Sequence, residues 1–345
     1  MTMQEKLKRA LSTKEGSVFV ILIAVMLIAT LFNPTFLSFT NFMDVLKANT
    51  VLGICSLGML LIILTGGIDA SVCGQLTLIA VLAGEIIVKT GVTNLFVLYL
   101  FALALGAVTG TINGLLVSRL ELPPIIATLG LNSVIMGFVK YYTNGTWINL
   151  SAYGNISAFG MIKLFSFTNE SGSVIGLPIQ LLLFGAMLLI TWFILNRTLL
   201  GRSIMAMGSN PVSAERIGLK TKALNTFAYT YAGMMYGFAA ITYICIMNAV
   251  DPNAFLGFEM DVIGAVVLGG ALLSGGSGSV LGTFLGVLLF SFISNGLTLA
   301  HISTYWQSII VGFIILLAVS FDMIKLHRSE RLQTKVDIIP KEDLA

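Results

Sequence analysis

RTLLGRSIMAMGSNPVSAERIGLKTK, residues 197–222, is the polar stretch around which an otherwise apolar chain is organised. It carries five basic residues against one acid, Glu215. Within it, Asn210 suits a helix N-cap, Pro211 the first helical position and Gly218 the stop. The pattern predicts a helix of about two turns in a loop between two membrane spans. Two roles fit this helix: a solvated basic loop that only sets topology, or a docking site for a cytosolic partner.

The composition of the chain is that of a membrane protein. Its residues are 57% hydrophobic and 10% charged, with a mean hydropathy of +0.95. A soluble domain carries about a quarter charged residues, and so few charges could not cover a surface in water. The three cysteines, Cys55, Cys73 and Cys245, fall in apolar segments without metal-ligand spacing, so we expect buried hydrophobic side chains and no metal.

Apolar runs along the sequence predict an all-helical fold, because each is long enough to cross the bilayer at about 20 residues. We expect ten spans in a single transmembrane domain, at residues 17–32, 45–65, 70–88, 95–117, 125–142, 179–195, 223–247, 262–273, 279–297 and 304–321. The eighth is short, and its glycines indicate an irregular or broken helix. The loop 196–222 and the tail 322–345 complete the domain.

The basic residues predict which side of the membrane each loop faces. Four lie in the N-terminal segment, one is Arg119, five lie in the 197–222 stretch and five in the tail, which together make fifteen of nineteen. The other four, Lys47, Lys89, Lys140 and Lys163, fall in loops of the opposite side. Because Lys and Arg are retained in the cytoplasm, we expect both termini and the 197–222 loop to be cytoplasmic.

A glycine pattern raises the possibility of an internal repeat. Glycines recur at a spacing of four in the fourth and ninth spans, at Gly106, Gly110 and Gly114 and at Gly278, Gly282 and Gly286. Five spans separate the two sets, so they would cross in opposite directions, as in an inverted repeat of five spans. The alternative is two unrelated close-packed helix faces, since this spacing is common in membrane helices.

Catalytic and nucleotide-binding motifs are missing from the sequence. There is no G-x-x-x-x-G-K-[ST] run, and the only two histidines, His301 and His327, belong to no cluster with cysteines or acids. We therefore expect a chain that is not itself an enzyme, needs no cofactor and draws on no ATP site of its own.

Two acids in the apolar region need an explanation, because a charge in hydrocarbon is costly. Asp69 follows a Gly-Gly break between the second and third spans. It can cap the third span, or it can line the cytoplasmic mouth of a pathway. Glu85 precedes Lys89 by four residues, which predicts a helical ion pair near the outer end of its span.

Uncharged polar residues inside the spans are more informative about the cargo. Each could bond one helix to another, which is the default role, and together they could line a polar pathway. No Lys or Arg lies near mid-membrane, so a neutral hydroxylated solute fits better than an ion. The residues are Gln75, Asn113, Thr128, Asn132, Ser133, Asn295 and Gln307.

Four runs of the sequence carry a resemblance to a known family. They are TGGIDAS at 65–71, Asn113-Gly114 with PPIIATLG at 123–130, GSNPVSAERIGL at 208–219, and the segment 257–322 with GFEMDVIGAVVLGG, GGSGSVLGTFLG, NGL, YWQ and AVSFD. From about residue 33 to 322 the chain resembles permease subunits of bacterial ABC importers of the ribose and monosaccharide type, within the branched-chain-type permease superfamily.

The resemblance implies a machine with several parts. It implies a dimer of permeases, identical or paralogous, in the bacterial inner membrane, powered by cytosolic ATPase subunits and supplied by an external sugar-binding protein. The helix carrying the Asn-Pro run is where such permeases meet the ATPase, which favours docking. The docking residues are Asn210, Pro211, Ala214, Glu215, Arg216 and Gly218.

An incoming binding protein would meet the outer acids Asp251, Glu259 and Asp261, although the last two could instead cap the eighth helix. The chain departs from the family pattern at Ala70, Cys73, Gly74, Ser274 and Ser277, which affects the choice of sugar. We expect an ATP-driven importer of a neutral sugar or sugar-like solute. The alternative is a secondary transporter in which Asp69 or Glu85 couples protons.

Overall fold

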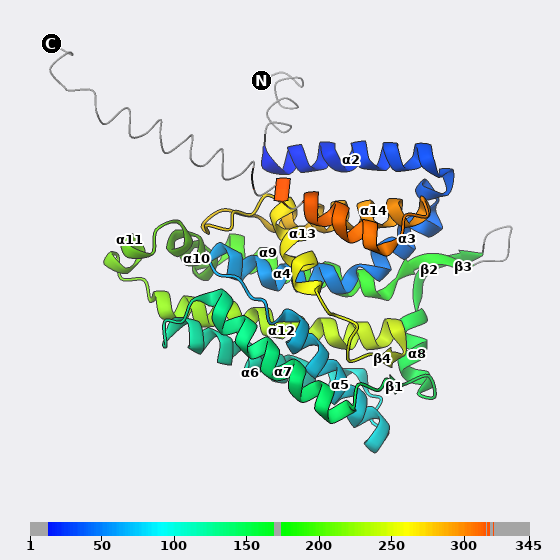
Figure 1. The fold of residues 1–345 in the computed structure, drawn as a ribbon, viewed down its shortest axis with the longest axis horizontal. Coiled ribbons are helices and arrows are strands. Elements are labelled where there is room, and N and C mark those ends of the chain that lie inside the picture. Colours follow the sequence, from blue (N-terminus) through cyan, green and yellow to red (C-terminus); the bar gives the residue numbers. More distant parts are fainter. Residues whose placement is uncertain (1–12, 169–173, 315, 318–319, 321–345) are drawn as a thin grey trace, which may run out of the picture.

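The computed structural model describes residues 13–168, 174–314, 316–317 and 320. Most long helices run side by side along one direction, which is horizontal in Figure 1. The short helices α10 and α11 lie at one end of this bundle, and the strands and α8 lie at the other. The predicted tail at 322–345 and the N-terminal basic residues Lys6, Lys8 and Arg9 lie outside the described residues.

The helices follow the predicted spans closely. Seven predicted spans correspond to long helices whose ends differ from the prediction by at most three residues, the second falls on α3 and α4, and the eighth is displaced from α13 by four to five residues. The long ones are α2 (Lys14–Phe32), α5 (Val72–Thr90), α6 (Leu95–Ser118), α7 (Pro124–Thr143), α9 (Ile179–Arg197), α12 (Thr221–Met247) and α14 (Val280–Leu299). The shorter ones are α3 (Phe39–Ala48), α4 (Thr50–Leu64), α8 (Gly154–Met161), α10 (Leu199–Ser209), α11 (Pro211–Arg216), α13 (Phe258–Leu268) and the 3₁₀ turn η1 (Pro34–Leu37).

Seven of the described helices are long and apolar enough to cross a membrane. The pair α3 and α4 makes up to eight, because together they pass the same test although they are bent by 49° at Asn49. The predicted eighth span is α13, which has only 11 residues, as its shortness indicated. Of the tenth, residues 304–314 are helical and the remainder lies partly outside the described residues.

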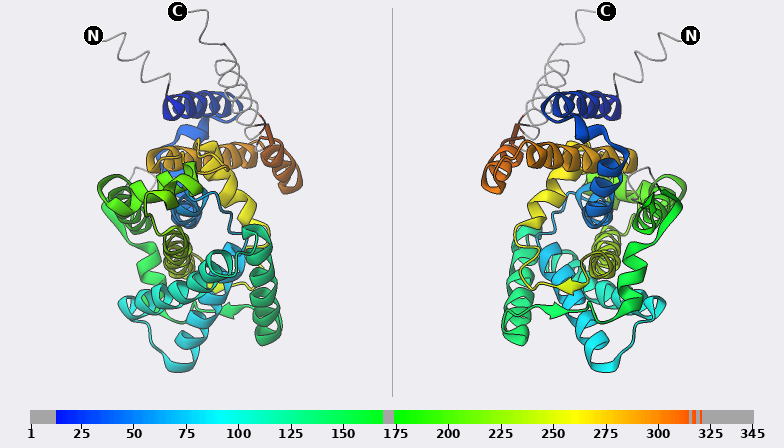
Figure 2. Two further views of the ribbon diagram at one scale, coloured as in Figure 1. Left: turned by 90° about the vertical axis from the view of Figure 1, so that its left-hand side faces the viewer. Right: turned by 90° about the vertical axis from the view of Figure 1, so that its right-hand side faces the viewer.

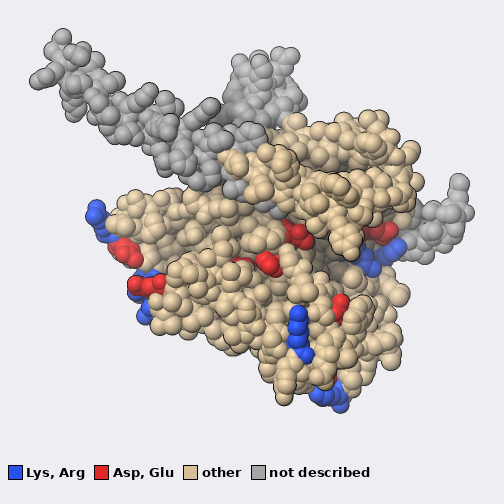
Figure 3. Space-filling view, viewed as in Figure 1, with Lys and Arg blue, Asp and Glu red and all other residues tan. Residues whose placement is uncertain are grey.

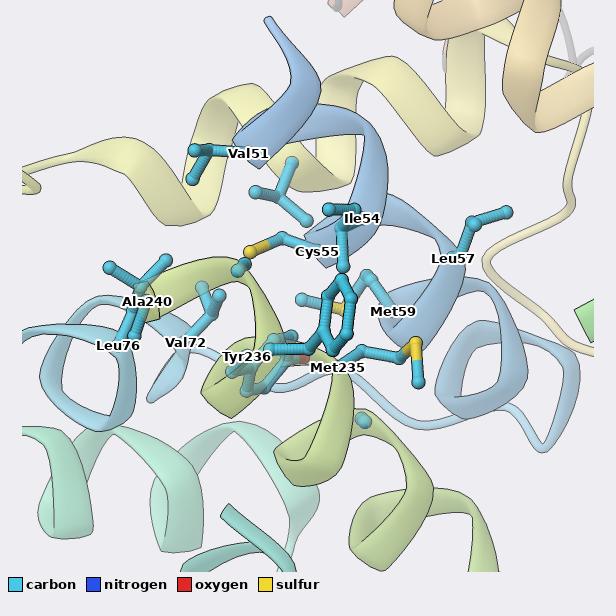
Figure 4. Close-up of a cluster of buried hydrophobic side chains, with 14 of the residues drawn as sticks. Val51, Ile54, Cys55, Leu57, Met59, Val72, Leu76, Met235, Tyr236 and Ala240 are labelled. Carbon is cyan, nitrogen blue, oxygen red and sulfur yellow. The ribbon is translucent and has the colours of Figure 1, made fainter. Parts of the chain in front are cut away.

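The core is organised around α12, which is buried along most of its length. Helix α6 packs on it backbone to backbone at two glycines, since a Cβ on Gly106 or Gly110 would collide with the backbone at Gly233 or Tyr229. On another side α12 contacts α4, every residue of which is buried. Figure 4 shows side chains of α4, α5 and α12 meeting there, among them Ile54, Leu76 and Tyr236.

The two predicted glycine stripes pack against different partners. Those of α6 face α12, whereas Gly282 and Gly286 of α14 press on the backbone of α13 at Gly269 and Ala265. Gly278 precedes α14, which begins at Val280, so the second stripe has two helical members instead of the predicted three. The close approach of backbones is what the spacing predicted, while the inverted repeat stays a prediction.

Short strands, which were not predicted from the sequence, lie at one end of the molecule. Strands β1 (Ile148–Asn149) and β4 (Ala249–Val250) pair antiparallel, as do β2 (Lys163–Thr168) and β3 (Val174–Pro178). Helix α8 lies beside them, and the Gly160 carbonyl accepts from Lys47 Nζ at 2.7 Å. This end gathers the loops that the basic-residue count assigns to the outside.

The opposite end gathers the loops assigned to the cytoplasm. Lys14 at the start of α2 donates to Gly270 O and Ser277 Oγ. Lys222 at the start of α12 pairs with Glu121, which follows α6, at 2.6 Å. In the views of Figure 2, α12 is seen nearly along its axis, whereas α13 slants across the bundle. Each predicted side of the membrane therefore corresponds to one end of the bundle.

Candidate functional site

The predicted docking helix is present as α11. Asn210 caps it, with Oδ1 accepting the Ser213 N–H at 2.9 Å, and Pro211 occupies the first helical position. Gly218 follows the helix with a φ of +87°, a backbone conformation that a side chain would strain. The local signals in the sequence were therefore sufficient to locate both ends of this helix.

The exposed face of α11 is partly apolar, which the sequence reading missed. Val212 is 60% exposed and Ile217 at the end of the helix is 75% exposed, whereas Ala214 is buried. Glu215 is held in place by Thr221, whose Oγ1 donates to Oε1 at 2.6 Å. Both exposed apolar residues could have been noticed in the sequence, because Val212 is the only large apolar residue of α11 and Ile217 follows the helix directly.

A cavity of about 390 Å³ lies behind α11. Its walls come from the ends of α4 and α6, the start of α7 and the start of α12, including Ser118, Pro123 and Asn225. The side of α11 that bears Pro211 and Glu215 forms the remaining wall. The helix therefore has open space behind part of it and packs on the bundle through Ala214, which belongs to the hydrophobic core.

A polar cluster is buried between the helices, beside the loop that follows α4. We define it as Asp69, Ser71, Gln75, Thr109 and Asn113. Asp69 Oδ1 accepts the backbone N–H and the hydroxyl of Ser71, at 2.8 and 2.6 Å. The amide nitrogens of Gln75 and Asn113 both donate to Ser71 Oγ, at 2.8 and 2.6 Å, and Thr109 Oγ1 donates to Gln75 Oε1 at 2.7 Å.

The loop at 65–71 is also tied to α7, and the cluster is closed to solvent. Thr128 Oγ1 accepts the Ala70 N–H at 3.0 Å, and Asn132 Oδ1 accepts the Gly74 N–H at 2.8 Å. Asp69, Gln75, Asn113 and Thr128 have no exposed surface. In this conformation these predicted pathway residues bond helices together, which was their default interpretation. The interpretation of Asp69 as the cap of the third span is wrong, because Ser71 is the N-cap of α5 and the Asp69 carboxylate bonds to Ser71 and to none of the first N–H groups of the helix.

Two other predicted pathway residues lie apart from the polar cluster. Asn295 on α14 exchanges side-chain hydrogen bonds with Asn41 on α3, at 3.0 and 3.2 Å. Gln307 donates to Ile302 O at 2.9 Å. The structure thus brings five predicted pathway residues together around the loop at 65–71 and leaves Asn295 and Gln307 on the α14 side; the five are Asp69, Gln75, Asn113, Thr128 and Asn132.

The three outer acids separate into two locations. Asp251 follows β4 at the strand-bearing end, where its Oδ1 accepts the Asn253 N–H. Glu259 lies in the first turn of α13, and its backbone N–H and carboxylate both contact Cys73 Sγ. Cys73 is 17 residues from Thr90, where α5 ends near the strands, so Glu259 lies about 25 Å from that end of the bundle. Asp261 shares the first turn of α13, which fits the alternative helix-end role.

These inner acids are open on one face of the molecule. Glu259 and Asp261 are partly exposed, and Met260 between them is 59% exposed. Figure 3 shows acidic side chains near the middle of this face, well away from either end of the bundle. The predicted pair of Glu85 and Lys89, by contrast, is confirmed at 2.7 Å near the outer end of α5.

The fold defines the class of protein as a polytopic helical membrane protein. Residues 41–319 match the family described as the branched-chain amino acid transport system permease component, and the chain belongs to this family. The ribose import permease protein RbsC of Escherichia coli (strain K12) is 34% identical over 310 residues, 90% of this chain and 93% of that protein. No solved structure matches the chain.

Two further relatives show how widely the similarity extends. The ribose import permease protein RbsC of Bacillus subtilis (strain 168) is 34% identical over 88% of this chain and 91% of its own. The galactose/methyl galactoside import permease protein MglC of Escherichia coli (strain K12) is 31% identical over 92% and 96%. The similarity covers almost the full length of each protein, as the sequence motifs predicted.

Proposed function

We propose that this chain is the transmembrane permease subunit of an ATP-driven, binding-protein-dependent importer of a neutral sugar. The observation that carries the proposal is full-length similarity to import permeases for ribose and for galactose. The buried polar groups and the lack of basic side chains among the described parts of the bundle core suit an uncharged, hydroxylated cargo.

Energy would come from a separate ATPase that binds at α11. The chain has no P-loop motif of its own. Helix α11 presents Val212 and Ile217 outward, and it is fixed at its start by the Asn210 cap. An isolated two-turn helix is marginal in water. We therefore expect α11 to be stabilised by its cap and by packing against the ATPase.

We place the sugar passage on the face that bears Glu259, Met260 and Asp261. Carboxylates some 25 Å inside the outer end of the bundle would be costly against lipid, so this face must meet water or protein. A second permease of the same or a related kind would cover it and enclose the passage. The polar cluster would hold the wall of that passage from behind, by bonding α5, α6 and α7 to the loop at 65–71.

The proposed topology has ten spans with both termini in the cytoplasm. The grouping of loops at the two ends of the bundle supports it. A cysteine placed at Ser209 should then be labelled by an impermeant maleimide only from the cytosolic side, and one placed at Ser157 only from outside. The binding protein would dock near Ser157 and Asp251. Labelling of both positions from the same side would exclude the ten-span arrangement.

Reconstitution tests the function as a whole. The permease, its copurified ATPase and the binding protein are placed in liposomes, and uptake of radiolabelled D-ribose, D-galactose and L-leucine is measured. We expect sugar uptake that requires all three proteins and ATP. Uptake driven by a proton gradient without the ATPase would instead support the secondary transporter. ATP-dependent uptake of leucine alone would replace the sugar by an amino acid.

A further inference from the structure

Three backbone segments meet without intervening side chains close to α11. They are the end of α4 at Leu64, the end of α10 at Gly208, and the loop before α14 at Gly276; we call this contact the glycine junction. A Cβ on Gly208 would collide with Leu64 O and would crowd the Gly276 nitrogen. The Gly276 N–H donates to Leu64 O at 2.9 Å.

The conformations of the junction glycines show that this contact is specific. Gly275 and Gly276 have φ values of +91° and +70°, in the left-handed region where a side chain is strained. A Cβ on Gly275 would lie 2.9 Å from both Gly208 O and Gly66 N. Leu64 O is one of the helix-terminal carbonyls that have no partner within α4, and the Gly276 N–H satisfies it. The three segments therefore interlock through main-chain atoms.

On one side the glycine junction leads directly to the predicted docking helix. Gly208 is the second-last residue of α10, and α11 begins at Pro211. Asn210, the residue between the two helices, forms hydrogen bonds to both of them. Its N–H donates to Ala206 O of α10, and its side chain caps α11. A displacement of α11 therefore displaces the end of α10 by nearly the same amount.

On the other side the glycine junction leads to the polar cluster. Leu64 is followed by the loop at 65–71, which carries Asp69. Tyr229 of α12 binds this loop: its hydroxyl donates to Ile68 O at 3.3 Å and lies against Gly67. The loop then reaches α7 through Thr128 and α6 through Asn113. Helices that would form the wall of the passage are thus bonded to the segment that Gly208 contacts.

We propose that the glycine junction is the mechanical link between α11 and the buried polar loop, so that it couples ATP hydrolysis to sugar movement. The inference rests on the proposed function for what is coupled, but the link itself is a property of this chain. Main-chain contacts transmit displacement well because no flexible side chain lies between them and packed interiors deform little. Coupling of this kind must act in both directions.

The link can be tested on the purified chain alone, by hydrogen–deuterium exchange. Tyr229→Phe deletes the hydroxyl that binds the loop at 65–71 and keeps the aromatic ring. We expect faster amide exchange in residues 65–71 and also, by about threefold, in residues 210–218 beyond the junction. Tyr99→Phe is the matched control, since it deletes a comparable hydrogen bond to Thr242 elsewhere on α12. It should leave residues 210–218 unchanged.

The second experiment measures coupling in the reconstituted transporter. In Gly208→Ala the ratio of sugar molecules imported to ATP hydrolysed should fall by about tenfold. Gly185→Ala, at a helix position with open space around it, should keep the wild-type ratio. If the Gly208→Ala protein does not fold, the hydrogen–deuterium exchange experiment decides whether the link exists. The link would be overturned if Tyr229→Phe left the amide exchange of residues 210–218 unchanged. It would also be overturned if Tyr99→Phe raised that exchange by the same factor. Wild-type liposomes without ATP-dependent uptake would refute the proposed function and leave the exchange result to decide the link.

Discussion

Helix α11 and the polar cluster are built in opposite ways. Helix α11 consists of six consecutive residues with a local cap, and it presents Val212 and Ile217 to solvent. The polar cluster draws its residues from α5, α6 and a loop, and all of them are buried. The first can be damaged while the bundle survives, because few core contacts depend on it. The second cannot, because it bonds several helices together.

The largest effect should come from removing the carboxylate of the polar cluster. Asp69→Ala deprives the Ser71 N–H and hydroxyl of their acceptor in a buried site, at about 1–3 kcal/mol for each unsatisfied group. We expect a strongly lowered melting temperature in detergent and a reduced membrane level. Asp69→Asn retains one acceptor oxygen and should lose less. A melting curve for Asp69→Ala that matches wild type would show that the cluster does not hold the fold.

Breaking α11 should abolish transport with the fold retained. Ala214→Pro removes the N–H that donates to Asn210 O and costs roughly 3 kcal/mol in a helix interior. Since α11 lies at the end of the bundle, insertion and melting temperature should stay near wild type. Sugar uptake into vesicles should fall to background. Normal uptake would mean that residues 210–218 form only a solvated loop.

A charge reversal on α11 should give a milder version of the same defect. Glu215→Lys removes the acceptor for Thr221 Oγ1 and adds a second positive charge next to Arg216. We expect uptake to fall about threefold, and the loss to shrink at high salt, because exposed charges act mainly on association and are screened. Glu215→Gln, which keeps an acceptor oxygen, serves as the control. A salt-independent loss would point to α11 unfolding instead of weakened docking.

The smallest effect is expected at the ion pair beside the cavity. Lys222 donates to Glu121 and lowers the pKa of its carboxyl below the usual value. A carboxyl with a lowered folded-state pKa stabilises the protein at neutral pH, and that contribution is lost as pH falls through the lowered pKa. Both side chains are exposed, so the gain is small. Glu121→Gln should leave the melting temperature at pH 7 unchanged, and a shift of several degrees would contradict this.

These regions also differ in how far the sequence could predict them. Asn210, Pro211 and Gly218 are local signals, and they located α11 correctly at both ends. The spans followed from apolar runs for the same reason, since each run needs only its own residues to be recognised. The kink at Asn49 and the pairing of β1 with β4 escaped, because they depend on segments distant in the sequence or on short strands of ordinary composition.

The candidate site was harder to predict because its parts meet only in the folded chain. The sequence indicated that Asp69, Gln75, Asn113 and Thr128 were unusual, and the structure brings all four to one loop. It did not indicate that they would be fully buried. Nor could it place Glu259 against Cys73, some 186 positions away, because the depth of Glu259 is set by the short α13.

Thermal stability and ATPase retention, measured together on Ala214→Pro and Asp69→Ala, test the contrast most directly. Each variant is purified from membranes with its copurified ATPase, and a melting curve is recorded on the same sample. Ala214→Pro should melt like wild type and lose the ATPase. Asp69→Ala should melt well below wild type, and whatever fraction remains folded should still retain the ATPase. Full ATPase retention by Ala214→Pro, or loss of stability in both variants alike, would contradict the account.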